Sequence, residues 1–138
     1  MSRTKIAIAG ALGRMGNNLI NSALSNNNVE LVGVFDVKDI DPSFINKNQI
    51  QNVFTTREES FEKADIVIDF TIPKALFNFT EAAVSNNAGL VIGTTGLDES
   101  HFNLLKQTSN STKVFYAPNM SYGAVSYTHL TLPTKRIV

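Results

Sequence analysis

The sequence contains no cysteine, no excess of charge of either sign and no long apolar run. Without cysteine it can form neither a disulfide framework nor a thiolate metal site, which suits the cytoplasm, where we expect the protein to act. Twelve Lys and Arg residues balance twelve Asp and Glu residues without a basic block, so we expect neither nucleic acid nor a membrane as partner. The absence of a long apolar run excludes a membrane-spanning helix, and the first residues lack a signal-peptide segment.

What is present is an ordinary globular composition of 138 residues, 43% of them apolar and 17% charged. This length suits one domain with a substantial core. Between residues 6 and 116, short apolar runs alternate with segments of helical periodicity. Such alternation is typical of a parallel sheet with helices on both faces. The sequence therefore predicts an α/β fold with a doubly wound parallel sheet of Rossmann type.

The expected strands span residues 6–9, 29–35, 66–70, 90–92 and 114–116. Helices are expected at 15–24, from a capping-box pattern at Thr56, after Pro73 and at 98–110. Residues 37–52 are expected to be irregular, with Asp41-Pro42 marking a turn.

The first expected strand ends in three glycines spaced three apart, Gly10, Gly13 and Gly16, and a helical pattern follows at once. Glycine lets a backbone fold tightly around a phosphate, which the positive end of the following helix then faces. The spacing is GxxGxxG rather than GxGxxG, so the motif is a variant of the dinucleotide fingerprint, and a tight turn without ligand is the alternative. Asp36, twenty residues after the last glycine, favours the dinucleotide.

Asp36 ends the second expected strand and could accept two hydrogen bonds from the adenosine ribose hydroxyls. A carboxylate there would repel a ribose 2′-phosphate, so the sequence predicts NADH as the preferred cofactor and NADPH as the second choice. Arg14 and Lys38 are either phosphate contacts that soften this preference or ordinary surface charges. For Asp36 itself, a solvated acid at a strand end is the alternative.

The other unusual segments also follow expected strands, and the carboxyl ends of parallel strands share one edge of a sheet. Gly93-Thr-Thr-Gly96 offers N–H groups and hydroxyls to a nicotinamide or its ribose, or else is an ordinary turn with threonine caps. Asn119 suits an amide or a backbone contact, and His101 is expected to face solvent from a helix. No metal-ligand cluster and no Ser/His/Asp arrangement is visible in the sequence.

Four segments together carry a resemblance to one family. They are G-x-x-G-R-M-G over residues 10–16, I-D-F-T over 68–71 with Pro73, G-T-T-G over 93–96, and A-P-N-M-S over 117–121 with Gly123. In order and spacing they resemble dihydrodipicolinate reductase, also called 4-hydroxy-tetrahydrodipicolinate reductase, of the diaminopimelate route to lysine. The similarity extends from residue 4 to about residue 123.

The resemblance implies a cofactor site and a small-molecule substrate. The implied cofactor residues are Gly10, Ala11, Leu12, Gly13, Arg14, Met15 and Gly16 at the pyrophosphate, Asp36 at the adenosine ribose, Phe70 and Thr71 at the nicotinamide ribose, Gly93, Thr94 and Thr95 at the nicotinamide, and Ala117, Pro118, Asn119 and Met120 opposite them. The implied reaction passes a hydride to a cyclic imine dicarboxylate with loss of water, giving tetrahydrodipicolinate.

The sequence departs from the family after Gly123. Members continue into a second domain that holds the substrate, builds a homotetramer and carries an E-x-x-H-H-x-x-K stretch with the proton donor. That stretch is absent here, and Ala124-Val125 stands where Val-Asn is expected. We therefore expect residues 1–123 to form a dinucleotide-binding domain, truncated before the second domain, with no catalytic residue and no turnover of its own.

Residues 124–138 break the α/β rhythm and resemble translated adaptor or vector sequence, with a genuine terminal strand as the alternative. Two other functions remain as alternatives. One is a stand-alone dinucleotide-binding module that senses redox state without catalysis; such a module should end in folded structure. The other is a different two-domain dehydrogenase, such as homoserine dehydrogenase, against which the D-F-T and A-P-N-M-S segments argue.

Overall fold

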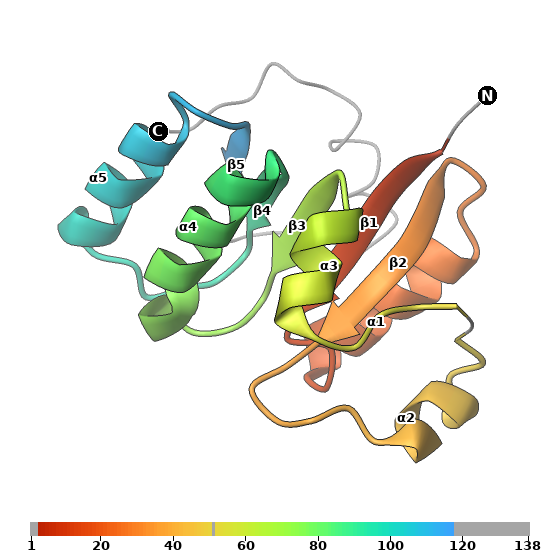
Figure 1. Cartoon of the computed structure of the whole chain (residues 1–138). Helices are drawn as coiled ribbons and strands as arrows, with labels where there is room; N and C mark the ends of the chain where they lie inside the picture. Colours follow the sequence, from red (N-terminus) through yellow and green to blue (C-terminus); the bar gives the residue numbers. More distant parts are fainter. Residues whose placement is uncertain (1–2, 51, 118–138) are drawn as a thin grey trace.

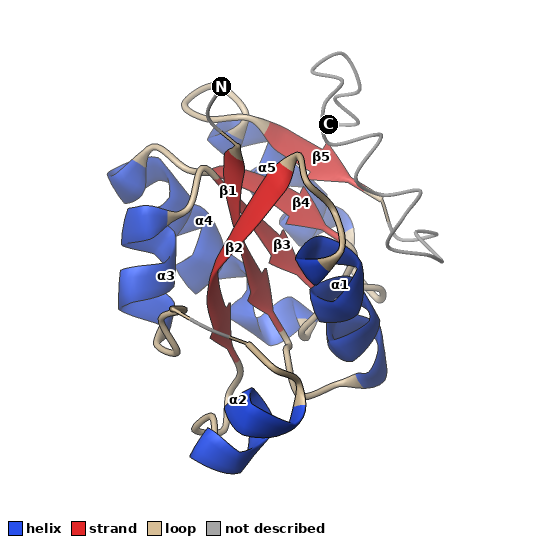
Figure 2. Ribbon diagram, turned by 90° about the vertical axis from the view of Figure 1, so that its right-hand side faces the viewer, coloured by secondary structure: helices blue, strands red, loops and turns tan. Residues whose placement is uncertain are grey.

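The computed structural model describes residues 3–50 and 52–117. Their centre is a five-stranded parallel sheet in the order β2-β1-β3-β4-β5. The strands are β1 (Thr4–Ala9), β2 (Val29–Phe35), β3 (Ile66–Asp69), β4 (Gly89–Ile92) and β5 (Val114–Tyr116). Helices lie on both faces of the sheet (Figures 1 and 2), so the doubly wound α/β fold is confirmed. Within the described ranges, no helix is long and apolar enough to cross a membrane.

The winding direction reverses at β1, which pairs with β2 on one side and with β3 on the other. One further parallel bridge joins Gly33 of β2 to Phe54, on the side away from β1. The Phe54 N–H donates to the Val32 carbonyl at 2.8 Å, and the Val34 N–H donates to the Phe54 carbonyl at 2.9 Å. In the six-stranded Rossmann sheet a further strand pairs with this edge of β2. Here a single residue, Phe54, occupies that position.

Two apolar cores lie on opposite faces of the sheet, which is why the strands are nearly continuous apolar runs. The first is covered by α3 (Arg57–Lys63), α4 (Leu76–Asn86) and α5 (Glu99–Thr108). Within it the rings of Phe35, Phe61 and Phe79 form a cluster with centroids 5.7–5.9 Å apart. The second is covered by α1 (Arg14–Leu24), which buries Leu19 and Ile20 completely.

Local signals mark where three segments of helix begin, and the sequence predicts the first two of them. The Thr56 hydroxyl accepts the Glu59 N–H at 3.3 Å at the start of α3. Pro73 is the first residue of a short 3₁₀ helix, η1 (Pro73–Ala75), that leads directly into α4. At α5 the Asp98 carboxylate accepts the N–H groups of Ser100 and His101.

The prediction that residues 37–52 are irregular is wrong in part, because they contain the helix α2 (Pro42–Lys47). Asp41 accepts the Ser43 N–H at 2.8 Å, and Pro42 occupies the first helical position, where its missing N–H has no consequence. Phe44 and Ile45 pack against the core under α1. The Asp41-Pro42 pair thus begins a helix instead of marking a turn.

Candidate functional site

The carboxyl ends of all five strands lie along one edge of the sheet, which we call the rim, because every strand pairing is parallel. The segments that follow β1, β2, β3 and β4 at the rim are residues 10–13, 36–38, 70–72 and 93–98. The sequence predicts that residues 10–16, 36–38, 70–71, 93–96 and 117–120 converge. The first four segments meet here, Ala117 follows β5, and residues 118–120 lie outside the described residues. In sheets of this type, ligands bind beyond the carboxyl ends of the strands, at the point where the strand order reverses.

Two of the three glycines after β1 are required by the fold itself. Gly10 has a φ of +86°, and a Cβ atom there would lie 2.6 Å from the carbonyl oxygen of Phe70. A Cβ atom at Gly16 would lie 2.1 Å from the carbonyl oxygen of Gly10. Both contacts are with backbone atoms, so a side chain at either position would displace the loop.

Gly13 differs, because nothing in the described chain requires a glycine there. Its φ is −81°, and an added Cβ would have only one neighbour, the Gly10 carbonyl oxygen, at an ordinary 3.5 Å. Gly13 is exposed and is the N-cap of α1, which has no side-chain cap and no acidic residue in its first turn. Glycine is itself a favourable N-cap residue, and a close approach from outside is a further reason for the absence of a side chain here. A helix start of this kind attracts anions.

Asp36 lies directly beside the glycine loop. Its carboxylate accepts the Leu12 N–H at 2.9 Å and the Val37 N–H at 2.7 Å, one on each oxygen. The carbonyl of Phe35, the preceding residue, accepts the N–H groups of Gly10 and Ala11 at 2.9 and 3.2 Å. Each carboxylate oxygen keeps a second acceptor site, so the half-buried Asp36 can still receive a ribose hydroxyl.

The loops after β3 and β4 are packed against each other. A Cβ atom at Gly93 would lie 2.3 Å from the Phe70 ring, so this glycine makes room for that ring. The carbonyl of Asp69 accepts the Gly93 N–H at 2.8 Å and the Thr94 hydroxyl at 3.3 Å. Thr94 is buried and caps no helix. The alternative that the threonines are ordinary helix caps is therefore wrong, because Asp98 caps α5.

The structure describes most of the predicted cofactor residues at the rim. Leu12, Gly13, Arg14 and Thr95 are exposed there, Met15, Asp36, Phe70, Thr71 and Ala117 are half-buried, and Gly10, Ala11, Gly16, Gly93 and Thr94 are buried. Ala117 is held at the end of β4 by donating its N–H to the Ile92 carbonyl at 2.8 Å. Pro118, Asn119, Met120 and the tail 124–138 lie outside the described residues.

Asp69 belongs to the I-D-F-T segment but has no predicted role of its own; it is a fully buried acid at the end of β3. Its Oδ1 accepts the Thr71 N–H at 2.8 Å and the Thr71 hydroxyl at 2.5 Å, and its buried Oδ2 has no partner among the described residues. Burial raises the pKa of this carboxyl group, and the hydrogen bonds from Thr71 oppose the shift. The available signal was an acid closing an otherwise β-branched strand.

His101 also differs from its prediction. It is half-buried, and its imidazole folds back over the start of α5, where Nδ1 accepts the Asp98 N–H at 3.0 Å. The two residues complete a capping box, with the Asp98 carboxylate accepting the His101 N–H at 3.2 Å. His101 is thus a structural residue of α5.

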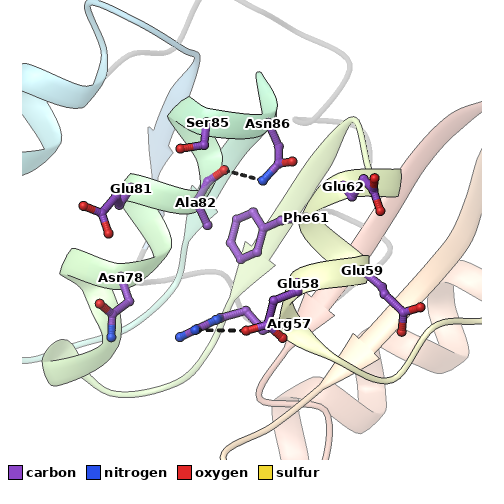
Figure 3. Close-up of a pocket in the computed structure, with 10 residues that line it drawn as sticks. All are labelled: Arg57, Glu58, Glu59, Phe61, Glu62, Asn78, Glu81, Ala82, Ser85 and Asn86. Carbon is purple, nitrogen blue, oxygen red and sulfur yellow. Dashed lines mark hydrogen bonds and ion pairs between the residues drawn. The ribbon is translucent and has the colours of Figure 1, made fainter.

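A pocket of about 570 Å³ lies between α3 and α4, and the segments that follow the strands at the rim do not line it (Figure 3). Glu58, Glu62 and Glu81 line it, and Arg57 donates to Glu58 at 3.1 Å. The buried ring of Phe61 lies between the two helices. A pocket with this excess of carboxylates disfavours a pyrophosphate. Across the described ranges, no group of three or more His, Cys, Asp or Glu residues could hold a metal ion.

The strand order, the glycine loop with its uncapped helix start and the neighbouring Asp36 define a class: a Rossmann-type α/β domain with the dinucleotide-binding fingerprint. Sequence comparison narrows the class. Residues 4–120 match the family model described as "Dihydrodipicolinate reductase, N-terminus". The chain belongs to this family, and the resemblance on which the sequence prediction relied is confirmed.

Relatives and solved structures agree with this assignment. The chain is 39% identical over 123 residues to 4-hydroxy-tetrahydrodipicolinate reductase of Sulfurimonas denitrificans, covering 86% of this chain and 46% of that protein. With the reductase of Pelagibacter ubique it is 33% identical over 136 residues, covering 99% and 51%. The chain thus spans about half the length of the curated relatives it matches.

Among solved structures, a dipicolinate-bound dihydrodipicolinate reductase from Paenisporosarcina sp. TG-14 superposes with a TM-score of 0.65 at 29% identity, covering 86% of this chain and 48% of that one. GenD2 from gentamicin A biosynthesis, in complex with NAD, superposes with a TM-score of 0.68 at 16% identity, covering 86% and 35%. The second match shows that the fold is shared.

Proposed function

We propose that this chain is the NAD(P)H-binding part of a 4-hydroxy-tetrahydrodipicolinate reductase. Membership of the family and the names of the relatives support the reductase activity. Because the chain spans about half of those relatives, the proposal assigns cofactor binding to the described domain and the reduction itself to a longer protein. Residues 1–123 then form the cofactor domain, and the substrate-binding domain and the homotetramer belong to the longer protein.

The observation that carries the proposal is Gly13. The fold explains Gly10 by its positive φ and Gly16 by a backbone contact, but it leaves Gly13 exposed without a steric reason to lack a side chain. A pyrophosphate that approaches the backbone at the start of α1 supplies that reason. The uncapped N–H groups of α1 suit the pyrophosphate, and the neighbouring Asp36 suits the adenosine ribose next to it.

Different segments of the chain would bind different parts of the cofactor. Residues 10–16 would hold the pyrophosphate, Asp36 the adenosine ribose, and Phe70, Thr71 and Gly93 to Thr95 the nicotinamide end, with residues 117–120 opposite them. The dinucleotide supplies a hydride when it is bound. The contribution of the chain is to fix the orientation of the donor ring and to keep water from one side of it.

NADH is proposed as the preferred cofactor, with NADPH accepted less well. Asp36 supports this preference because a negative charge beside the adenosine ribose disfavours a 2′-phosphate. Arg14 and Lys38 are both exposed near this end of the rim and would moderate the preference. The proposed substrate of the longer protein is a cyclic imine dicarboxylate, which accepts the hydride and loses water.

Direct binding tests the proposal. The full 138-residue chain is titrated into NADH and NADPH, and the change in nicotinamide fluorescence and the heat of binding are followed. We expect saturable binding of both, tighter for NADH, competed by ADP-ribose and not by adenosine. No binding of either dinucleotide by folded protein contradicts the proposal. Tighter binding of NADPH contradicts only the assigned preference.

A further inference from the structure

Asp69 occupies the middle of the rim. Its strand neighbours are Ala9 of β1 and Ile92 of β4, the last residues before the glycine loop and before Gly93. The next residue, Phe70, touches both loops: its carbonyl oxygen lies against Gly10, and its ring lies against Gly93. Any change in the path of the chain after Asp69 is therefore transmitted to both loops.

The side chain and the backbone of Asp69 hold different partners. Oδ1 accepts the N–H and the hydroxyl of Thr71, which turns the chain immediately after β3. The backbone carbonyl accepts the Gly93 N–H and the Thr94 hydroxyl from the neighbouring loop. One residue thus ties together the two segments proposed to flank the nicotinamide and its ribose.

A purely structural acid does not explain this arrangement. Asp69 is completely buried, makes no ion pair among the described residues and leaves Oδ2 without a partner. Burying a carboxyl group in this way opposes folding. Val67, two positions earlier in β3, packs in the apolar core, and an apolar residue at position 69 would also suit a buried position in this strand. A residue retained at a cost to stability beside a binding site points to a role in that site.

We propose that Asp69 is a positioning residue for the nicotinamide end of the cofactor site, acting through the two hydrogen bonds that Oδ1 accepts from Thr71. This inference rests on the proposed function. Asp69 is buried and therefore does not itself touch the cofactor. It fixes Thr71 and, through Phe70, the spacing between the β3 and β4 loops.

Three variants of the full chain separate positioning from general stability. Asp69→Ala removes the acceptor, Asp69→Asn keeps an oxygen where Oδ1 lies, and Val67→Ala opens a similar space in the same strand without touching the rim. Residue-resolved amide hydrogen exchange of Thr71, by NMR without cofactor, reports on the turn. NADH titration of the same samples reports on the site.

We expect Asp69→Ala to speed Thr71 exchange and to weaken NADH binding by about tenfold, the equivalent of one to two hydrogen bonds. Asp69→Asn should stay within about threefold of the wild-type chain in both measurements, as should Val67→Ala. If Asp69→Ala does not fold, Asp69→Leu, which fills the space without an acceptor, takes its place.

Normal exchange and normal affinity in Asp69→Ala overturn the positioning role, and so does an Asn variant that loses as much as the Ala variant. These failures are distinct from a failure of the proposed function. If the proposed function is wrong, the wild-type chain itself binds no dinucleotide, and both proposals are refuted together. Losses in Val67→Ala equal to those in Asp69→Ala also overturn the positioning role, because they assign the effect to the stability of β3.

Discussion

The contrast between Gly13 and Gly16 gives the sharpest test of the site. We expect Gly13→Ala to leave stability nearly unchanged and to weaken cofactor binding by at least about tenfold, whereas Gly16→Ala should lower stability itself. The two substitutions add the same methyl group three residues apart, one at the N-cap of α1 and one in its first turn. Their different outcomes follow from what each methyl group would meet.

At Gly16 the new Cβ would lie 2.1 Å from the Gly10 carbonyl oxygen, 2.8 Å from its carbon and 2.9 Å from the Ala11 Cα. The loop must move by about 1 Å, and overpacking of this kind costs up to about 3 kcal/mol. The higher helix propensity of alanine returns about 1 kcal/mol. The net expectation is a free energy of unfolding lower by about 2 kcal/mol.

At Gly13 the nearest atom would be 3.5 Å away and φ is already suited to alanine. Replacing glycine by alanine at an N-cap costs about 0.5–1 kcal/mol, and a smaller loss of chain entropy on folding returns about 0.4–1 kcal/mol. The two effects nearly cancel. A pyrophosphate lying against the exposed Gly13 backbone would collide with the methyl group, so NADH affinity should fall by at least about tenfold, or about 1.4 kcal/mol.

Urea unfolding followed by circular dichroism measures the stability difference, and NADH fluorescence titration measures the affinity. Gly89→Ala is the matched control, because its Cβ would have only neighbours at 3.5 Å or more and Gly89 lies at the start of β4, opposite the rim. Wild-type affinity in Gly13→Ala would refute the pyrophosphate assignment. A Gly13→Ala chain as unstable as Gly16→Ala would refute the steric argument.

Three further predictions follow from single contacts. Asp36→Ala should weaken NADH binding more than NADPH binding, with exposed Asp39→Ala as the charge-matched control; equal losses would remove Asp36 from the ribose. Because burial raises the pKa of Asp69 above its ordinary 3.8, the folded chain retains a proton that the unfolded chain releases. The contribution of Asp69 to the free energy of unfolding should therefore fall as pH rises from about 3.8 through the raised pKa, so the difference between the wild-type chain and Asp69→Asn in urea titrations should change with pH in this direction. Phe61→Ala should lower stability by about 3–5 kcal/mol, since its ring is fully buried between Phe35 and Phe79; a loss below 1 kcal/mol would contradict this packing.

Most of the fold could be predicted from the sequence because a parallel sheet covered on both faces leaves a simple pattern. Residues 29–35 and 114–116 coincide with β2 and β5. The prediction was wrong where a single turn decides the structure, as at α2, whose signal is confined to Asp41 and Pro42. Phe54 could not be predicted as a strand position at all, because one residue has no periodicity.

The location of the candidate site could be predicted from the sequence, but the sequence did not show which of its residues serve the fold and which serve the ligand. Spacing alone treats Gly10, Gly13 and Gly16 as equivalent, whereas the distances to Phe70 and Gly10 show that two of them serve the fold. The exposed Gly13 is then the one glycine of the three that no contact within the fold requires, and a ligand approaching its backbone gives a reason for it. Asp69 presents the reverse case: a ligand cannot reach it, yet its hydrogen bonds fix the residue that the ligand is proposed to meet. Position in the sequence marks the rim, but only packing separates residues that bind from residues that hold the binding residues in place.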